Sequence, residues 1–253
     1  MAKATFRFYE ELNDFLAPRR RRRDIEVDIA PTETVKHAIE ALGVPHTEVE
    51  LVLVDGTSVG FERRLADSER VAVYPRFEAL DITPLLRLRE RPLRRTRFVA
   101  DSHLGGLARR LRLSGFDTLF DNGWPDDELL RLSLAEGRIV LTRDRELLKR
   151  RELTHGCFVH AEQPDAQWRE VIERLDLHAA QRPFTRCLVC NGLLHAVPKS
   201  EVAPALPPSV RERHQRFARC GGCARVYWEG SHWQRMRAKL DALVAARAGT
   251  AAA

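Results

Sequence analysis

The chain has 253 residues, 44% of them hydrophobic, which suits two or three packed domains and excludes a wholly disordered chain. The first ten residues lack the apolar core of a signal peptide and no stretch approaches about 18 consecutive apolar residues, so we expect a cytoplasmic protein without a membrane span. The formal net charge is +6, and 37 of the 42 basic residues are arginine, which favours a polyanionic partner such as nucleic acid or reflects a GC-rich coding sequence.

Residues 1–78 are predicted to form a β-grasp domain. Alternation of polar and apolar residues predicts four strands, at 5–9, 24–29, 50–54 and 70–75. The arginine run 19–23 lies in the turn between the first two strands, and a helix is expected from its N-cap Thr32 to Gly43. This β-β-α-β-β order resembles the ubiquitin-like sulfur carriers.

Those carriers end in a free Gly-Gly, whereas Pro75 and Arg76 continue the present chain, so carrier chemistry is not expected. We expect this domain to be a docking or stabilising module. Whether it also binds a protein partner is left open.

Residues 79–96 are predicted to be an arginine-rich linker, because they contain two prolines and most of an arginine run that ends at Arg97. Such runs are usually solvated, and otherwise they contact phosphates. Arg94, Arg95 and Arg97 are therefore candidate contacts for RNA.

Residues 97–180 are predicted to form a three-layer α/β domain with a parallel sheet, because strands and helices alternate. The expected strands are 97–100, 116–120, 138–142 and 157–160. The expected helices are 104–112, 126–136, 145–151 and 165–175. Ligands bind such sheets at the carboxyl ends of the strands.

Aspartates follow two of these strands. Asp101 comes directly after the first strand, Asp144 lies near the end of the third, and Asp126 begins the intervening helix. Carboxylates that converge from separate elements suit Mg2+ or Mn2+, which can activate water against a phosphodiester. Taken singly, each aspartate is as well explained as a helix cap or a turn residue.

Residues 181–245 are predicted to form a zinc ribbon followed by a helix over 231–245. Four of the five cysteines form two Cys-x-x-Cys pairs, Cys187 with Cys190 and Cys220 with Cys223. Without an export signal a metal site is favoured over disulfides, and four cysteines suit structural Zn2+ with no open position for catalysis. Gly221 and Gly222 are expected to let the second turn fold tightly, and Arg186, Arg219 and Arg225 to offset the thiolate charge. Cys157 is expected to be a buried strand residue.

Two further groups of residues have open alternatives. Arg143 and Arg145 flank Asp144 and are candidates for binding phosphate, or are solvated arginines at a helix end. Tyr227 and Trp228 suit stacking on unpaired bases, but packing of the ribbon explains them as well or better.

Several motifs together resemble the Mut-seven C-terminal RNase domain family, a PIN-like nuclease family, over about residues 96–243. They are FVAD at 98–101, LGGLARRLR at 104–112, GFD at 115–117, RIVLTRD at 138–144, CLVCNG at 187–192, CGGC at 220–223 and VYWEGSH at 226–232. The resemblance implies a PIN-like nuclease sheet with a zinc ribbon, an N-terminal ubiquitin-like domain and metal-dependent RNA cleavage.

By the same resemblance, Asp101, Asp126 and Asp144 match the acidic positions of the family. Asp127 and Glu128 are near enough to replace Asp126. PIN nucleases commonly use four acids, and the candidates for the fourth are Asp121, Glu146 and Asp165.

The resulting hypothesis is an enzyme, a Mg2+- or Mn2+-dependent ribonuclease. The alternatives are a non-catalytic RNA- or ribosome-binding module that uses the ribbon and the arginine clusters, and a protein-interaction adaptor that acts through the β-grasp domain.

Overall fold

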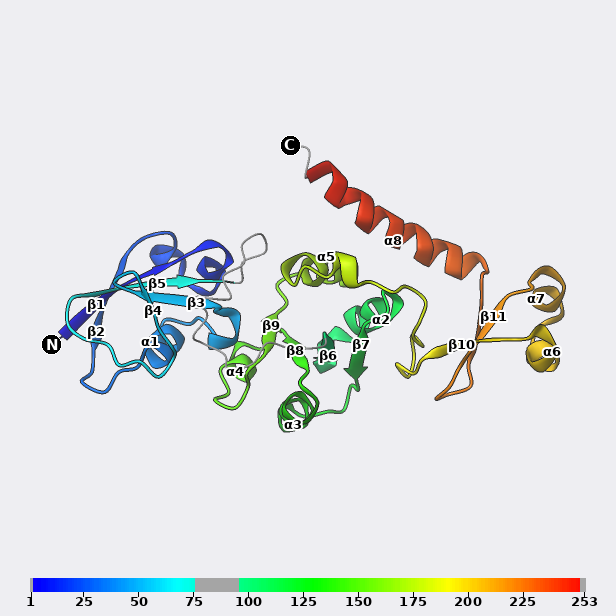
Figure 1. The fold of residues 1–253 in the computed structure, drawn as a ribbon, viewed down its shortest axis with the longest axis horizontal. Helices are drawn as coiled ribbons and strands as arrows, with labels where there is room; N and C mark the ends of the chain where they lie inside the picture. Colours follow the sequence, from blue (N-terminus) through cyan, green and yellow to red (C-terminus); the bar gives the residue numbers. More distant parts are fainter. Residues whose placement is uncertain (1, 76–95, 251–253) are drawn as a thin grey trace. The chain divides into compact units, whose positions relative to one another are not determined.

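The computed structural model describes residues 2–75 and 96–250, with side chains described up to residue 242 (Figure 1). The chain divides into two compact units, Met1–Arg95 with Trp124–Val159 and Thr96–Gly123 with His160–Ala253. The predicted domains 1–78, 97–180 and 181–245 follow sequence order instead, and their boundaries stay a prediction. Among the described residues, no helix has both the length and the apolar character that a membrane crossing needs.

The N-terminal residues form a five-stranded mixed sheet with the order β2-β1-β5-β3-β4. Its strands are β1 (Ala2–Phe8), β2 (Ile25–Ile29), β3 (Leu51–Val54), β4 (Thr57–Ser58) and β5 (Glu69–Tyr74). Strands β1 and β5 are parallel, and the other neighbours are antiparallel. Buried residues of the sheet and of α1 (Val35–Ala41), such as Phe6, Ile39 and Val73, share one apolar core. The prediction of a β-grasp domain is confirmed.

The N-cap of α1 is Thr34 and not the predicted Thr32. The Thr34 hydroxyl accepts a hydrogen bond from the His37 N–H at 3.2 Å, whereas Thr32 lies in the preceding turn. The helix ends before Gly43, whose φ of +101° favours glycine, as the sequence predicts.

Within the first unit, the β-grasp residues pack against the segment 145–158. Buried His46 bonds through Nε2 to the Leu153 carbonyl at 2.8 Å, and the Thr47 hydroxyl donates to the Leu148 carbonyl at 3.3 Å. The carboxylate of Glu48 accepts a hydrogen bond from the Phe158 N–H. These contacts join segments about a hundred residues apart, so the β-grasp residues stabilise this part of the α/β region.

The α/β region contributes two pairs of neighbouring strands, β6 with β7 in the second unit and β8 with β9 in the first. Its strands are β6 (Arg97–Ala100), β7 (Asp117–Phe120), β8 (Ile139–Thr142) and β9 (Gly156–Phe158). Strand β6 pairs with β7 in parallel and β8 pairs with β9 in parallel, which confirms the parallel α/β prediction.

The helices of this region are α2 (Gly105–Leu113), α3 (Asp126–Glu136), α4 (Arg145–Leu148) and α5 (Pro164–Arg174). Helix α3 has the predicted bounds. Helix α4 is shorter than the predicted 145–151, because the N–H groups of Lys149 and Arg150 bond to carbonyls three residues earlier and close turns.

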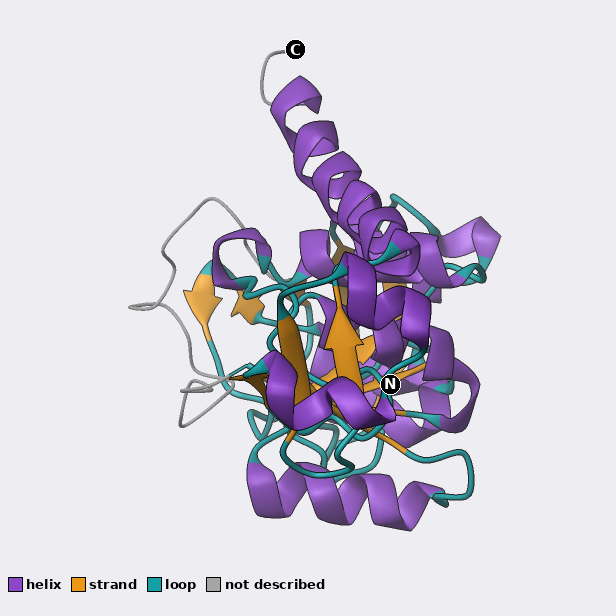
Figure 2. Ribbon diagram, turned by 90° about the vertical axis from the view of Figure 1, so that its right-hand side faces the viewer, coloured by secondary structure: helices purple, strands orange, loops and turns teal. Residues whose placement is uncertain are grey.

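The C-terminal region is an antiparallel ribbon with the order β10-β11-β12, from β10 (Leu194–Val197), β11 (Phe217–Cys220) and β12 (Val226–Trp228). Two short helices that the sequence analysis did not predict, α6 (Lys199–Val202) and α7 (Pro208–Arg213), lie between β10 and β11. Val202, Leu206 and Phe217 form a small core there. Figure 2 shows α8 (Ser231–Thr250) as one uninterrupted helix, five residues longer than predicted.

Candidate functional site

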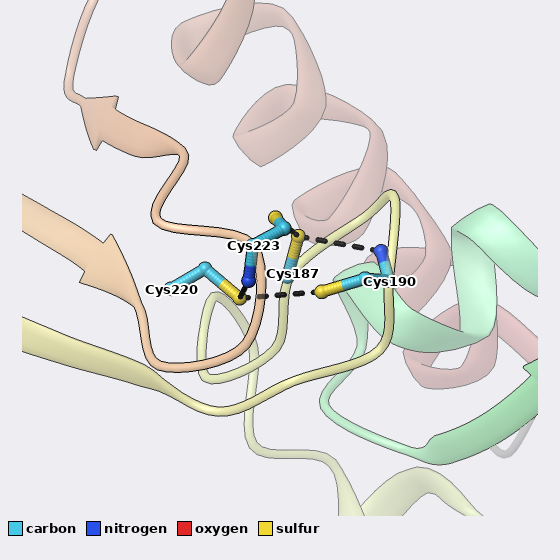
Figure 3. A group of neighbouring side chains, drawn as sticks. All are labelled: Cys187, Cys190, Cys220 and Cys223. Carbon is cyan, nitrogen blue, oxygen red and sulfur yellow. Dashed lines mark hydrogen bonds between the residues drawn. The ribbon is translucent and has the colours of Figure 1, made fainter.

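The four paired cysteines come together as predicted (Figure 3). Their Sγ atoms all lie within 4.8 Å of one another, with Cys187 at 3.6 Å from Cys223 and Cys190 at 3.3 Å from Cys220. Sulfurs about 2.3 Å from a tetrahedral zinc ion lie about 3.8 Å apart. The cluster therefore has the size and the donor set to hold a metal ion such as Zn2+.

Both cysteine pairs have the same turn geometry. In the first knuckle (Cys187–Asn191) the Cys190 N–H points at the Cys187 sulfur, 3.4 Å away, and in the second knuckle (Cys220–Ala224) the Cys223 N–H points at the Cys220 sulfur, 3.5 Å away. The residue after each pair is left-handed, with φ of +67° at Asn191 and +57° at Ala224. Backbone N–H groups aimed at sulfur stabilise the thiolates that a metal requires.

Glycine is required where the two knuckles approach each other. A Cβ atom on Gly192 would lie 2.9 Å from the Cys220 sulfur, closer than real Cβ atoms come, whereas Gly221 and Gly222 have more room, with nearest atoms at 3.4 Å. Gly221 and Gly222 were the glycines expected to allow the tight turn, but of the three it is Gly192 that has the tightest fit.

Hydrogen bonds prepare Cys187 to ionise. Burial raises the pKa of its thiol, but the Cys190 N–H and the Tyr227 hydroxyl, 3.1 Å from the sulfur, outweigh burial and lower that pKa to about 6. The Gly192 N–H lowers the pKa of Cys190, yet burial and the neighbouring sulfurs prevail and raise it to about 12. One thiolate thus disfavours the next, and a bound cation would remove this conflict.

The first knuckle is anchored on α2 and β7 by two buried polar side chains. The guanidinium of Arg112 donates to the carbonyls of Thr118, Leu188 and Val189 at 2.8–3.2 Å. Burial lowers the pKa of Arg112, and the nearby Cys187 and Cys190 thiolates partly offset this effect.

Asn191 completes the anchor. Its side chain accepts from the Thr118 N–H at 3.0 Å and donates to the Asp117 carboxylate at 2.8 Å. Arg112 and Asn191 both lie within the family motifs, but no role was predicted for either from the sequence. A charged residue on the apolar face of the predicted helix 104–112 was the available signal.

The arginines expected to flank the cysteines have different partners. Arg186 pairs with Asp117 at 3.5 Å and donates to the Asn191 carbonyl at 2.9 Å, so it belongs to the anchor of the first knuckle. Arg219 pairs with Glu201 at 3.1 Å, and Arg225 is exposed.

Asp101 and Asp144 follow strands as predicted, and each caps a helical turn. Asp101 comes after β6, and its Oδ1 accepts from the Ser102 N–H at 2.5 Å. Asp144 comes two residues after the end of β8, and its Oδ1 accepts from the Glu146 N–H at 2.7 Å. Asp126 is not a cap, because Pro125 holds the N-cap position of α3. Asp101 lies in one unit and Asp126 and Asp144 in the other, so their convergence stays a prediction.

The other candidate acids have basic or backbone partners. Asp127 pairs with Arg150 at 3.3 Å, and Glu128 forms two hydrogen bonds to Arg131, which lower the pKa of Glu128. Asp121 accepts from the Gly123 N–H, and Glu146 pairs with Lys149 at 2.9 Å.

Asp165 also has basic partners. It pairs with Arg110 and with Lys239 of α8, and these hydrogen bonds lower its pKa to about 2. Asp165 therefore joins α2, α5 and α8, which disfavours it as the fourth acid.

The arginines predicted to bind phosphate differ from one another in their surroundings. The Arg145 guanidinium lies 5.1 and 5.4 Å from the ring centroids of Phe15 and Phe158 and donates to the Phe15 carbonyl at 3.2 Å. These contacts give Arg145 a packing role, which disfavours it as a phosphate ligand. Arg97 approaches Asp117 at 3.9 Å, and Arg143 is exposed. Arg94 and Arg95 lie outside the described residues.

Tyr227 and Trp228 have structural roles within the ribbon, which agrees with the second of the two alternatives, packing of the ribbon. The Tyr227 hydroxyl contacts Cys187 and accepts from the Leu188 N–H at 3.2 Å, and burial and the Cys187 thiolate raise the pKa of Tyr227. Trp228 packs against the small ribbon core.

Comparison with known proteins places these elements in a family. A model described as Mut7-C ubiquitin matches residues 1–81, and one described as Mut7-C RNAse domain matches residues 96–240. Two solved structures of small archaeal modifier protein 1 from Haloferax volcanii are similar at 19% and 17% identity, each with a TM-score of 0.25 over 30% of this chain and 98% of theirs. No curated protein matches. The match to the RNAse-domain model covers more than half of the present chain, and the chain therefore belongs to the Mut7-C RNAse domain family.

Proposed function

We propose that this protein is a metal-dependent ribonuclease in which Asp101, Asp126 and Asp144 hold Mg2+ or Mn2+. The observation that carries the proposal is the match of the RNAse-domain model over 96–240, a range that includes all three aspartates. The positions of Asp101 after β6 and of Asp144 after β8 support it, because the carboxyl ends of parallel strands are the usual ligand site of such sheets.

The chemistry of the side chains fits hard divalent cations. Carboxylate oxygens are the ligands that Mg2+ and Mn2+ prefer, and such an ion, when bound, polarises the phosphodiester and activates water. Backbone N–H groups donate to Asp101 and Asp144, and these hydrogen bonds limit the rotation of both carboxylates. In this proposal the three aspartates supply negative charge, while Arg143, together with Arg94, Arg95 and Arg97, orients the RNA phosphates.

Zn2+ is the proposed ion of the four-cysteine cluster, in a structural role. Protein sulfur fills all four positions of a tetrahedral ion, so no position remains for a catalytic water. The anchoring of the first knuckle on α2 and β7 supports this role, because the metal then ties the ribbon to the α/β region.

The proposal is tested with Asp144→Asn, which keeps the side-chain volume but removes a negative ligand. We expect wild type to cleave mixed RNA with Mn2+, and the variant to lose most of this activity while it retains its fold and its RNA affinity. Asp28→Asn is the matched control, because it makes the same chemical change on the exposed side of β2 and should leave cleavage intact.

Equal cleavage by wild type and Asp144→Asn would indicate a contaminating nuclease and would refute the assignment. Absence of cleavage by wild type on several classes of RNA, with binding retained, would favour a non-catalytic RNA-binding module instead.

A further inference from the structure

A groove of about 760 Å³ lies in the second unit, lined by residues of α2, the first knuckle, β12 and the start of α8. Its charged lining is unbalanced. Four arginines face it, Arg109, Arg186, Arg216 and Arg225, against the single acid Glu229. The function proposed above uses none of these four arginines and leaves the groove without a role.

Two of the four arginines are available to a ligand. Arg186 belongs to the anchor of the first knuckle, and Arg216 pairs with Glu229 at 3.2 Å. Within residues 2–75 and 96–242, neither Arg109 nor Arg225 forms an ion pair, and both are exposed. They lie on separate segments, Arg109 in α2 and Arg225 directly after the second knuckle, so they place positive charge at two points of the groove.

The groove also holds an aromatic stack that is already formed. The rings of Phe184 and Trp233 lie nearly parallel, 28° apart, with centroids at 4.8 Å, and both side chains are half-buried. Phe184 has a φ of +60°, a conformation that costs a bulky residue free energy, and its N–H bonds to the Leu113 carbonyl at 3.0 Å. The hydrogen bond to Leu113 fixes the backbone at Phe184, and the stack of Phe184 on Trp233 belongs to the lining of the groove before any ligand binds.

We propose that this groove binds unpaired RNA, with a base stacked on Trp233 and the backbone phosphates at Arg225 and Arg109. Aromatic rings combined with unpaired cations are what single-stranded nucleic acid requires, since every base has a π face and every linkage a negative charge. Bases inside a duplex are covered by their neighbours and do not reach such a ring. An apolar peptide would fit the rings but leave the arginine charge uncompensated. The choice of RNA as the ligand rests on the proposed ribonuclease function.

The test measures the affinity of a short fluorescein-labelled oligouridine, without divalent metal, in the Asp144→Asn background. Trp233→Leu is expected to weaken binding about five-fold or more, the range for loss of one stacked base. Trp233→Phe should restore most of it. Arg225→Ala should weaken binding and reduce the salt slope by about one. Binding should also quench tryptophan fluorescence in the parent protein and less so in Trp233→Phe. A blunt RNA duplex should not compete.

Arg211→Ala is the matched control for charge, because Arg211 is an exposed arginine of α7 in the same unit and does not line the groove. It should leave affinity nearly unchanged. Zinc content and melting temperature of each variant separate loss of binding from loss of folding. Unchanged oligouridine affinity in folded Trp233→Leu and Arg225→Ala would overturn the proposal, as would equal competition by the duplex.

The two proposals fail separately. If groove variants weaken binding but no form of the protein cleaves RNA, the groove assignment stands and the ribonuclease assignment falls. If Asp144→Asn abolishes cleavage while groove variants bind as the parent does, the reverse holds.

Discussion

The two cysteine knuckles have the same backbone and different surroundings. Each has a buried first cysteine, an exposed second one and a left-handed residue after the pair. In the first knuckle that residue is Asn191, which is buried and bonded to β7, and Arg112 holds the adjacent carbonyls. In the second it is Ala224, which is exposed, and Arg225 beside it is exposed as well.

The residues that form the metal site differ from the residues that position it. The common Cys-x-x-Cys turn supplies the sulfur geometry in both knuckles, because N–H groups within the turn point at sulfur. Among the described residues, the first knuckle alone is held on the α/β region by side chains that are not metal ligands, those of Arg112 and Asn191. Substitutions at corresponding positions of the two knuckles should therefore differ, except at the cysteines themselves.

The largest effect is expected at the cysteines, where the two knuckles should be equivalent. Cys187→Ser and Cys220→Ser should each lose the metal and unfold the ribbon, because structural zinc supplies on the order of 10 kcal/mol. Metal content by mass spectrometry and hydrogen exchange of the ribbon measure this. Cys157→Ser is the control, since Cys157 lies outside the cluster and should keep one equivalent. A full equivalent of zinc in either knuckle variant would contradict the shared site.

Arg112→Met and Arg225→Met should separate the knuckles most clearly. Loss of the Arg112 guanidinium leaves three carbonyls without their donor, so we expect the free energy of unfolding to fall by about 2–4 kcal/mol. Arg225→Met removes an exposed cation and should change it by about 0.5 kcal/mol or less. Denaturant titration of the zinc-loaded proteins gives both values. Equal losses would show that Arg112 does not anchor the first knuckle.

The smallest change in the free energy of unfolding is expected at the left-handed residues Asn191 and Ala224, and its sign should differ between the two. Asn191→Gly keeps the backbone conformation but loses hydrogen bonds to Thr118 and Asp117, so it should destabilise by about 1–2 kcal/mol. Ala224→Gly relieves a left-handed alanine and should be neutral or stabilise by up to about 1 kcal/mol. Thermal melting at constant zinc compares the two. Destabilisation by Ala224→Gly as large as that by Asn191→Gly would remove the distinction between the knuckles.

Much of the secondary structure was predictable because its signals are local. Helix α3 has the predicted bounds, since Pro125 and the left-handed Gly137 delimit it in sequence. The start of α1 was misplaced by two residues, because Thr32 and Thr34 are both good caps, and Thr34 is the one that forms a backbone bridge with Arg64, a residue distant in sequence. Helices α6 and α7 were not predicted, since both are short and contain or follow prolines.

The sequence by itself determined the β-grasp and parallel α/β elements and the four-cysteine cluster, because apolar periodicity and Cys-x-x-Cys turns act over a few residues. Tertiary structure decided which side chains surround them. From sequence, Arg145 was a candidate phosphate ligand, but its guanidinium lies against the rings of Phe15 and Phe158. Nothing in the sequence distinguished Arg112 from the other arginines, and its role follows from its hydrogen bonds to the Leu188 and Val189 carbonyls. These contacts join residues that are distant in sequence, and the burial that gives such partners their strength exists only once the elements have packed.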